Sequence, residues 1–141
     1  MTEEIIWYRS GYKYQLAKDY VTTVAIVGRT AASAFIALAE DGQLQIVRGY
    51  AWDGPSGPAV DTKNFMRGSL VHDALYQLMR EGLLDSEQYR AVADKELQRI
   101  CLEDGMSRLR AWWVYTAVKS FGGPSSWVET PIETAPFRGN I

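Results

Sequence analysis

Residues 33–52, SAFIALAEDGQLQIVRGYAW, decide the fold of the first part of the chain. Two apolar runs flank the segment 40–43, and an Asp-Gly pair such as Asp41-Gly42 between apolar runs is a strong signal for a β-hairpin. Upstream, residues 12–27 (YKYQLAKDYVTTVAIV) are rich in β-branched and aromatic residues and alternate in part, as strands do. The intervening residues 28–33 (GRTAAS) resemble a loop. We therefore expect antiparallel β-hairpins, forming a small sheet, within residues 1–52.

The apolar period changes from two to about 3.6 residues after residues 53–64, DGPSGPAVDTKN, a glycine- and proline-rich segment that predicts a constrained loop. Residues 65–123 then contain three helix patterns with recognisable ends. The expected helices run from about Phe65 to Arg80 before Gly82, from the N-cap Asp85 with Gln88 at N3 to Glu103, and from the N-cap Ser107 to Gly122. Residues 124–141 hold three of the five prolines and are expected to form an extended tail.

The predicted fold class is therefore α+β, with N-terminal β-hairpins or a small antiparallel sheet followed by three helices. The first two helices should form an antiparallel pair, because the loop between them is short. A length of 141 residues suits one domain, so we expect residues 1–141 to form a single domain.

The composition excludes several classes of function. The net charge of −2 gives no field that would attract nucleic acid, and one cysteine cannot form an internal disulfide. One cysteine and one histidine cannot fill a tetrahedral zinc site. The acidic start MTEEIIWYRS lacks the apolar segment of a signal peptide, and no apolar run is long enough for a transmembrane helix. We expect synthesis in the cytoplasm.

The sole histidine, His72, lies at the edge of the apolar stripe of the first helix, one turn from Tyr76. Asp94 borders the apolar stripe of the second helix. In an antiparallel helix pair these two residues face each other, and we expect a hydrogen bond of about 2.6–3.2 Å between their side chains. A carboxylate on one imidazole nitrogen fixes the tautomer and leaves the other nitrogen to act as a base. The alternative is a border histidine bonded to a carbonyl group.

Asp73 lies about 100° further round the helix than His72 and is expected to point away from it. A carboxylate in that position, near a loop whose prolines fix the direction of its carbonyl groups, suits a hard cation. We expect Ca²⁺, with Mg²⁺ as the second choice, between Asp73 and the loop 52–57. Asp53 is either a further ligand or a cap of the loop through an Asx-turn.

The motifs GYAWDGPSGP, LVHDALYQLMREG, ADKEL and AWWVYTAVKSFGG occur in that order between residues 45 and 123. Together they resemble a family encoded by phages and prophages, the domain of unknown function 1353. The resemblance implies a phage or prophage protein, and it implies no activity.

The pattern H-D-x-x-Y followed by A-D-x-x-L is also similar to the catalytic helices of phospholipase A2, above all to the disulfide-free form in parvovirus capsid proteins. That resemblance implies that His72 is the general base, that Asp94 orients it, and that Tyr76 hydrogen-bonds Asp94. It implies that Asp73 binds Ca²⁺. The carbonyl ligands would come from the preceding loop, near Trp52, Gly54 and Ser56.

Two function classes follow. The first is a metal-assisted hydrolase of phospholipase A2-like type, whose His/Asp dyad activates water against a lipid ester or another envelope ester. The second is a non-enzymatic phage structural or accessory protein, associated with the virion or tail, in which the same residues form a buried network. A metal-dependent cell-wall amidase or peptidase fits less well, because one histidine is too few for the usual zinc ligand sets.

Three further expectations concern partners and packing. The tail 124–141 is a candidate contact for other phage proteins, and the virion is the alternative location to the host cytoplasm. Cys101 is expected to be a small buried residue and not a nucleophile. The run WWVY at residues 112–115 is expected to be core and border, with a lipid- or partner-facing patch as the alternative.

Overall fold

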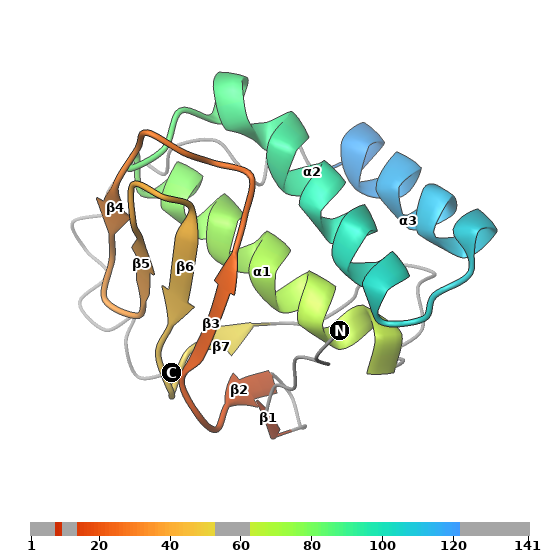
Figure 1. Ribbon diagram of the computed structural model, residues 1–141, viewed down its shortest axis with the longest axis horizontal. Coiled ribbons are helices and arrows are strands. Elements are labelled where there is room, and N and C mark those ends of the chain that lie inside the picture. Colours follow the sequence, from red (N-terminus) through yellow and green to blue (C-terminus); the bar gives the residue numbers. More distant parts are fainter. Residues whose placement is uncertain (1–7, 10–13, 53–62, 122–141) are drawn as a thin grey trace, which may run out of the picture.

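The computed structural model describes residues 8–9, 14–52 and 63–121 (Figure 1). Within these ranges short strands come first and helices follow, so the predicted α+β fold is confirmed. The strands are β1 (Tyr8–Arg9), β2 (Tyr14–Leu16), β3 (Tyr20–Thr23), β4 (Ala31–Ala32), β5 (Ile36–Leu38), β6 (Gln43–Ile46) and β7 (Ala51–Trp52). The helices are α1 (Lys63–Arg80), α2 (Ser86–Glu103) and α3 (Arg108–Phe121).

The strands form two antiparallel sheets, in the orders β1-β2-β7 and β3-β6-β5-β4. The division into two sheets was not predicted. The expectation of a loop over residues 28–33 was wrong in part, because Ala31 and Ala32 form β4 and pair with Leu38 and Ala37 of β5. Alanine has little preference for strands, so this pairing depends on the neighbouring strand and leaves no local signal.

The hairpin predicted at Asp41-Gly42 is present between β5 and β6, where Leu38 pairs with Leu44. The Gly42 N–H donates to the Ala39 carbonyl at 3.0 Å, and Asp41 Oδ1 accepts from the Gln43 N–H at 3.0 Å. Gly42 has a φ of 95°. A Cβ atom there would lie 2.5 Å from the Val24 carbonyl oxygen, so both the backbone conformation and the space demand glycine.

The helices begin and end close to the predicted positions. α1 begins at Lys63, two residues before the expected start, so the predicted loop is shorter than 53–64. Its end is capped as expected: Gly82 has a φ of 75°, and its N–H donates to the Met79 carbonyl. Asp85 caps α2 by accepting from the Glu87 N–H at 3.3 Å, and Ser107 caps α3 by accepting from the Arg110 N–H at 3.2 Å.

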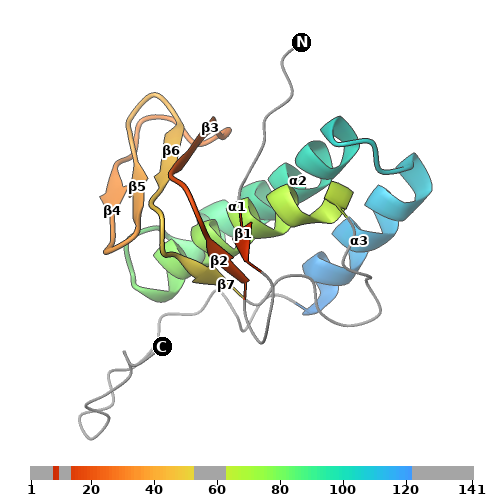
Figure 2. The same ribbon diagram turned by 90° about the horizontal axis from the view of Figure 1, so that it is seen from below.

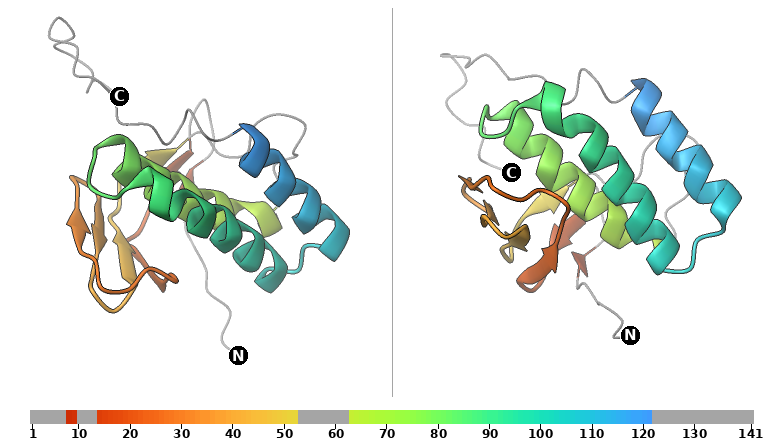
Figure 3. Two further views of the ribbon diagram at one scale, coloured as in Figure 1. Left: turned by 90° about the horizontal axis from the view of Figure 1, so that it is seen from above. Right: turned by 45° about the horizontal axis from the view of Figure 1, so that its top comes forward.

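α1 is the central element of the structure. It lies between the four-stranded sheet and α2, while α3 packs on the far side of α2 (Figures 1 and 3). The three-stranded sheet also lies against α1, as the view from below shows (Figure 2). Gly68 lets α1 approach α2 closely, because a Cβ atom there would lie 2.9 Å from Cys101 Sγ and 3.0 Å from Leu97 Cδ1.

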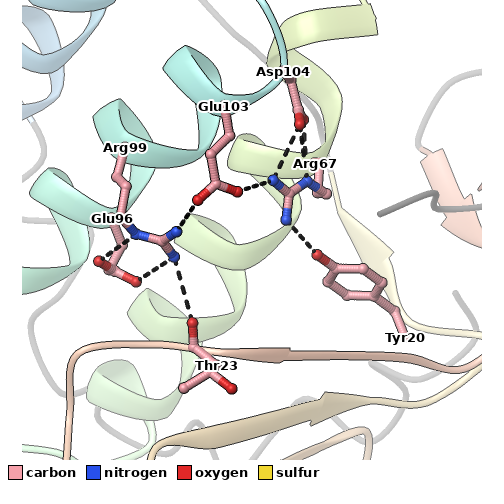
Figure 4. A network of polar contacts seen from close by, with 7 residues as sticks. All are labelled: Tyr20, Thr23, Arg67, Glu96, Arg99, Glu103 and Asp104. Carbon is pink, nitrogen blue, oxygen red and sulfur yellow. Dashed lines mark hydrogen bonds and ion pairs between the residues drawn. The ribbon is translucent and has the colours of Figure 1, made fainter. Parts of the chain in front are cut away.

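A buried arginine joins the two helices to the sheet near the start of α1 (Figure 4). Arg67 donates through Nη1 to Tyr20 Oη on β3 at 2.9 Å, and through Nη2 to Glu103 at 2.7 Å. Its Nε donates to both carboxylate oxygens of Asp104, at 3.1 and 3.3 Å. These contacts compensate the burial of the guanidinium charge and fix the end of α2 against α1.

Arg99 extends the same network on the outside of α2 (Figure 4). It contacts Glu96 at 2.9 Å, shares Glu103 with Arg67, and donates to the Thr23 carbonyl oxygen of β3 at 3.4 Å. The carboxylates of this network are bonded to arginines, so we assign it a structural role.

Substitution of Gly42, the residue with positive φ in the β5–β6 turn, tests how tightly that turn is packed, and Gly28 is its matched control. Gly28 also has a positive φ, of 80°, but a Cβ atom there would meet nothing within 4 Å. Gly28→Ala should therefore cost about 1–2 kcal/mol from backbone strain alone. Gly42→Ala should cost at least about 1 kcal/mol more, because its Cβ overlaps the Val24 carbonyl oxygen. Urea unfolding of both variants measures the difference, and equal losses would contradict the packing of this turn.

Candidate functional site

His72, Tyr76 and Asp94 form one hydrogen-bonded group between α1 and α2, which we call the His72 cluster. His72 Nε2 lies 2.8 Å from Asp94 Oδ1, so the hydrogen bond predicted between these side chains is confirmed. Tyr76 Oη donates to the same oxygen at 2.6 Å. Asp94 Oδ1 thus accepts two short hydrogen bonds, both from α1.

The spacing of the residues explains the geometry of the cluster. His72 and Tyr76 are one helical turn apart on α1, and their ring centroids lie 4.2 Å apart. α2 runs antiparallel to α1: Asp94 on α2 meets His72, while Asp104, beyond the end of α2, meets Arg67 five residues earlier on α1. The two rings therefore converge on one carboxylate.

Burial differs sharply within and around the cluster. The side chain of Asp94 is 2% exposed, and His72 is also buried. The side chain of Asp73 is 35% exposed, so it is the part of the site that solvent reaches most easily. Among the described residues, no buried side-chain nitrogen or oxygen lacks a hydrogen-bond partner. The carboxylate of Asp94 is thus a buried polar group whose hydrogen bonds both come from the cluster.

The helical step had led us to expect Asp73 to point away from His72, and this expectation was wrong. The Oδ1 atom of Asp73 lies 3.9 Å from His72 Nδ1, which is close but too long for a direct hydrogen bond. The step of 100° separates only the directions in which the two side chains leave the helix, and it does not fix the positions of their polar atoms. Asp94 and Asp73 therefore face opposite nitrogens of the same imidazole.

The hydrogen bonds assign the protons of the cluster. An ionised carboxylate only accepts, so neutral His72 carries its proton on Nε2 and keeps the lone pair of Nδ1 on the side of Asp73. Burial lowers the pKa of the His72 imidazole, but Asp73 and Asp94 outweigh it, and the pKa is raised above the usual 6.5. Burial and the bond to Asp94 raise the pKa of Tyr76, which keeps its hydroxyl as a donor.

The first residue of the loop predicted to supply metal ligands contacts α1 through its side chain. That residue, Trp52, is buried at the end of β7, and its Nε1 donates to Ser69 Oγ on α1 at 3.0 Å. Ser69 and Asp73 are one turn apart on α1, a spacing that places their Cβ atoms about 5–6 Å apart. Sequence reasoning missed Ser69, because a serine within a helix gives no sign of its partner. The other predicted ligands, Asp53, Gly54 and Ser56, lie outside the described residues.

A hard cation needs several oxygen ligands close together. In the ranges that the structure describes, no group of three or more His, Cys, Asp or Glu side chains is placed to hold a metal ion. Asp94 is occupied by His72 and Tyr76, whereas Asp73 offers a partly exposed carboxylate of the kind that Ca²⁺ prefers. The chemistry of Asp73 fits, and the remaining oxygen ligands would have to come from the loop beyond Trp52.

Cys101 is fully buried between α1 and α2, and burial raises the pKa of its thiol to about 12. The expectation that Cys101 is a small buried residue is confirmed. No helix in the described part of the chain is long and apolar enough to cross a membrane.

Comparisons with known proteins do not extend this description. No family model, curated protein or solved structure matches the chain.

The raised pKa of His72 predicts how stability depends on pH in metal-free buffer. A group whose pKa is higher in the folded state stabilises the fold fully below its unfolded value of about 6.5. That contribution is lost as the pH rises through the folded-state pKa. Urea unfolding between pH 6 and pH 9, with a chelator present, should show this loss in the wild type and not in His72→Gln. A parallel pH dependence in both proteins would contradict the proposed charge environment.

Proposed function

We propose that this protein is a phage-encoded, metal-assisted ester hydrolase of phospholipase A2-like type, in which the His72 cluster activates a water molecule. One observation carries the proposal: the imidazole is held at Nε2 by Asp94, while Nδ1 is directed towards the partly exposed carboxylate of Asp73. A histidine bonded to a carboxylate through one nitrogen is oriented as a general base through the other.

In the proposed reaction His72 Nδ1 accepts a proton from water, and the resulting hydroxide attacks the carbonyl carbon of an ester. Asp94 stabilises the imidazolium that forms, and Tyr76 holds Asp94 in place through its hydroxyl. The proton then passes from Nδ1 to the leaving alkoxide, and the acid and the alcohol are released. General-base catalysis of this kind contributes a factor of about 10²–10⁴.

Asp73 is proposed to hold Ca²⁺, with Mg²⁺ as the second choice, together with oxygens of the loop from Trp52 through Ser56. The contact of Trp52 with Ser69 supports this, because the indole of Trp52, the residue before the glycine- and proline-rich segment, reaches α1 one turn from Asp73. When bound there, the cation would stabilise negative charge on the ester oxygen in the transition state.

The biological setting is proposed from the resemblance of the motifs to the phage and prophage family. A protein of this kind would be made in the host cytoplasm and would act on a lipid or envelope ester. Association with the virion through residues 124–141, which lie outside the described residues, is the alternative setting.

A second candidate function is a non-enzymatic phage structural or accessory protein. The burial of Asp94 and the hydrogen bonds that it accepts favour it, because a satisfied buried network can specify one packing of two helices without any chemistry. The two candidates differ in what Asp73 does, since only the hydrolase needs a partner for that carboxylate.

Calcium titration and an ester assay separate the two candidates. The substrate is a short-chain phospholipid kept below its micelle concentration, so that no lipid surface is required. His72→Ala should lose hydrolysis about 10²-fold or more and still bind calcium. Asp73→Asn should lose both calcium binding and hydrolysis.

Glu87→Gln, which removes an exposed carboxylate from the first turn of α2, is the control and should change neither measurement. Circular dichroism would verify that each variant is folded. If the wild type gives no heat with CaCl₂, no ester turnover and no change in melting temperature with calcium, the hydrolase proposal fails and the structural role remains.

A further inference from the structure

α3 carries large apolar side chains on the side that faces away from α2. Leu109 is 76% exposed, Trp112 is 55% exposed and Trp113 is 41% exposed. Their spacing of three and four residues puts them on one side of the helix, which we call the outer face of α3. The expectation that WWVY would be core and border was therefore incomplete, because only Val114 of the four is buried.

The opposite side of α3 accounts for its packing. Ala111 and Val114 are buried against α2 in a small cluster with Leu97 and Cys101. α3 is the outermost helix in Figure 3, and its buried side packs on α2 and meets Phe65 of α1. The indoles of the outer face are therefore not needed to hold the helix in place.

The charged side chains of α3 are all basic, so they suit an anionic partner. Arg108 and Lys119 are exposed, Arg110 is partly exposed, and residues 108–121 contain no acidic residue, although the whole chain has a net charge of −2. At 100° per residue, Arg108 and Lys119 lie on one side of the outer face and Arg110 on the other. An apolar face with basic side chains along its edges suits a partner whose interior is apolar and whose outer surface is anionic.

We propose that the outer face of α3 binds an anionic phospholipid surface, with the helix lying in the plane of the membrane. The indoles of Trp112 and Trp113 suit the boundary between headgroups and acyl chains, and Leu109 suits insertion just below it. Arg108 and Lys119 would contact the anionic headgroups. The inference rests on α3 alone, so it does not depend on the proposed hydrolysis.

The charges also argue against the alternative partners. A second copy of the chain seated on this face would bring the basic side chains of two helices together, which disfavours a dimer. A nucleic acid would be attracted by Arg108 and Lys119, but it would not bury Leu109, the most exposed large apolar side chain in the described part of the chain. An anionic lipid surface would contact both the basic side chains and the apolar side chains of the outer face.

Vesicle co-sedimentation of the full chain tests the proposal. The vesicles contain phosphatidylcholine and phosphatidylglycerol in equal parts, and pure phosphatidylcholine vesicles are the comparison. Wild type should bind the anionic vesicles, and the double variant Leu109→Ser/Trp112→Ser should bind at least about tenfold more weakly. The double variant Arg108→Gln/Lys119→Gln should also lose about tenfold or more.

Val27→Ser is the matched control, because Val27 is 68% exposed but lies between β3 and β4, away from α3. It should bind like wild type, and all variants should keep the wild-type melting temperature. Vesicles with brominated acyl chains should quench tryptophan emission less in Trp112→Ser than in wild type.

Three results would overturn the proposal. The first is the absence of binding to anionic vesicles. The second is vesicle binding that Leu109→Ser/Trp112→Ser leaves unchanged. That result would mean that the basic side chains alone are recognised, so that a nucleic acid would suit this face as well as a membrane. The third is a concentration-dependent dimer, seen by analytical ultracentrifugation, that the same double variant dissociates. Loss of vesicle binding would leave the ester assay on a soluble substrate unaffected, so the two proposals fail separately.

Discussion

The structure depends on a buried carboxylate. Asp94 lies inside the contact between α1 and α2, where an uncompensated negative charge would cost several kcal/mol. Both hydrogen bonds that compensate it come from α1, from His72 and Tyr76. A shift of either helix by one turn would remove at least one of these two hydrogen bonds, so this carboxylate helps to set the register of the two helices.

A second polar contact holds the other end of the same helix pair. Arg67 on α1 bonds Glu103 and Asp104 at the end of α2, and also Tyr20 on β3. The interface between these two polar groups is apolar, and at Gly68 it leaves no room for a Cβ atom. Specific polar contacts at two points, with close packing between them, hold the imidazole of His72 in a fixed position.

Local signals predicted the hairpin at Asp41-Gly42, the caps of the helices and the meeting of His72 with Asp94, because each rests on short-range chemistry or on helical periodicity. The pairing of β4 and the partners of Arg67 and Ser69 were not predicted, because each depends on residues far along the chain. The direction of Asp73 was wrong, since backbone periodicity does not fix side-chain rotation. The exposure of Trp112 was expected only as the alternative, because aromatic residues at helical spacing are usually buried.

The central claim is that Asp94 holds His72 so that Nδ1 is available as a base. Because His72 is the sole histidine of the chain, the two imidazole nitrogens can be assigned without ambiguity by nitrogen-15 NMR. Above the pKa of His72, in metal-free buffer, the account predicts the neutral tautomer with its proton on Nε2 and a bare Nδ1. A proton on Nδ1 and a bare Nε2 would contradict it, because Nε2 would then have no proton to donate to Asp94.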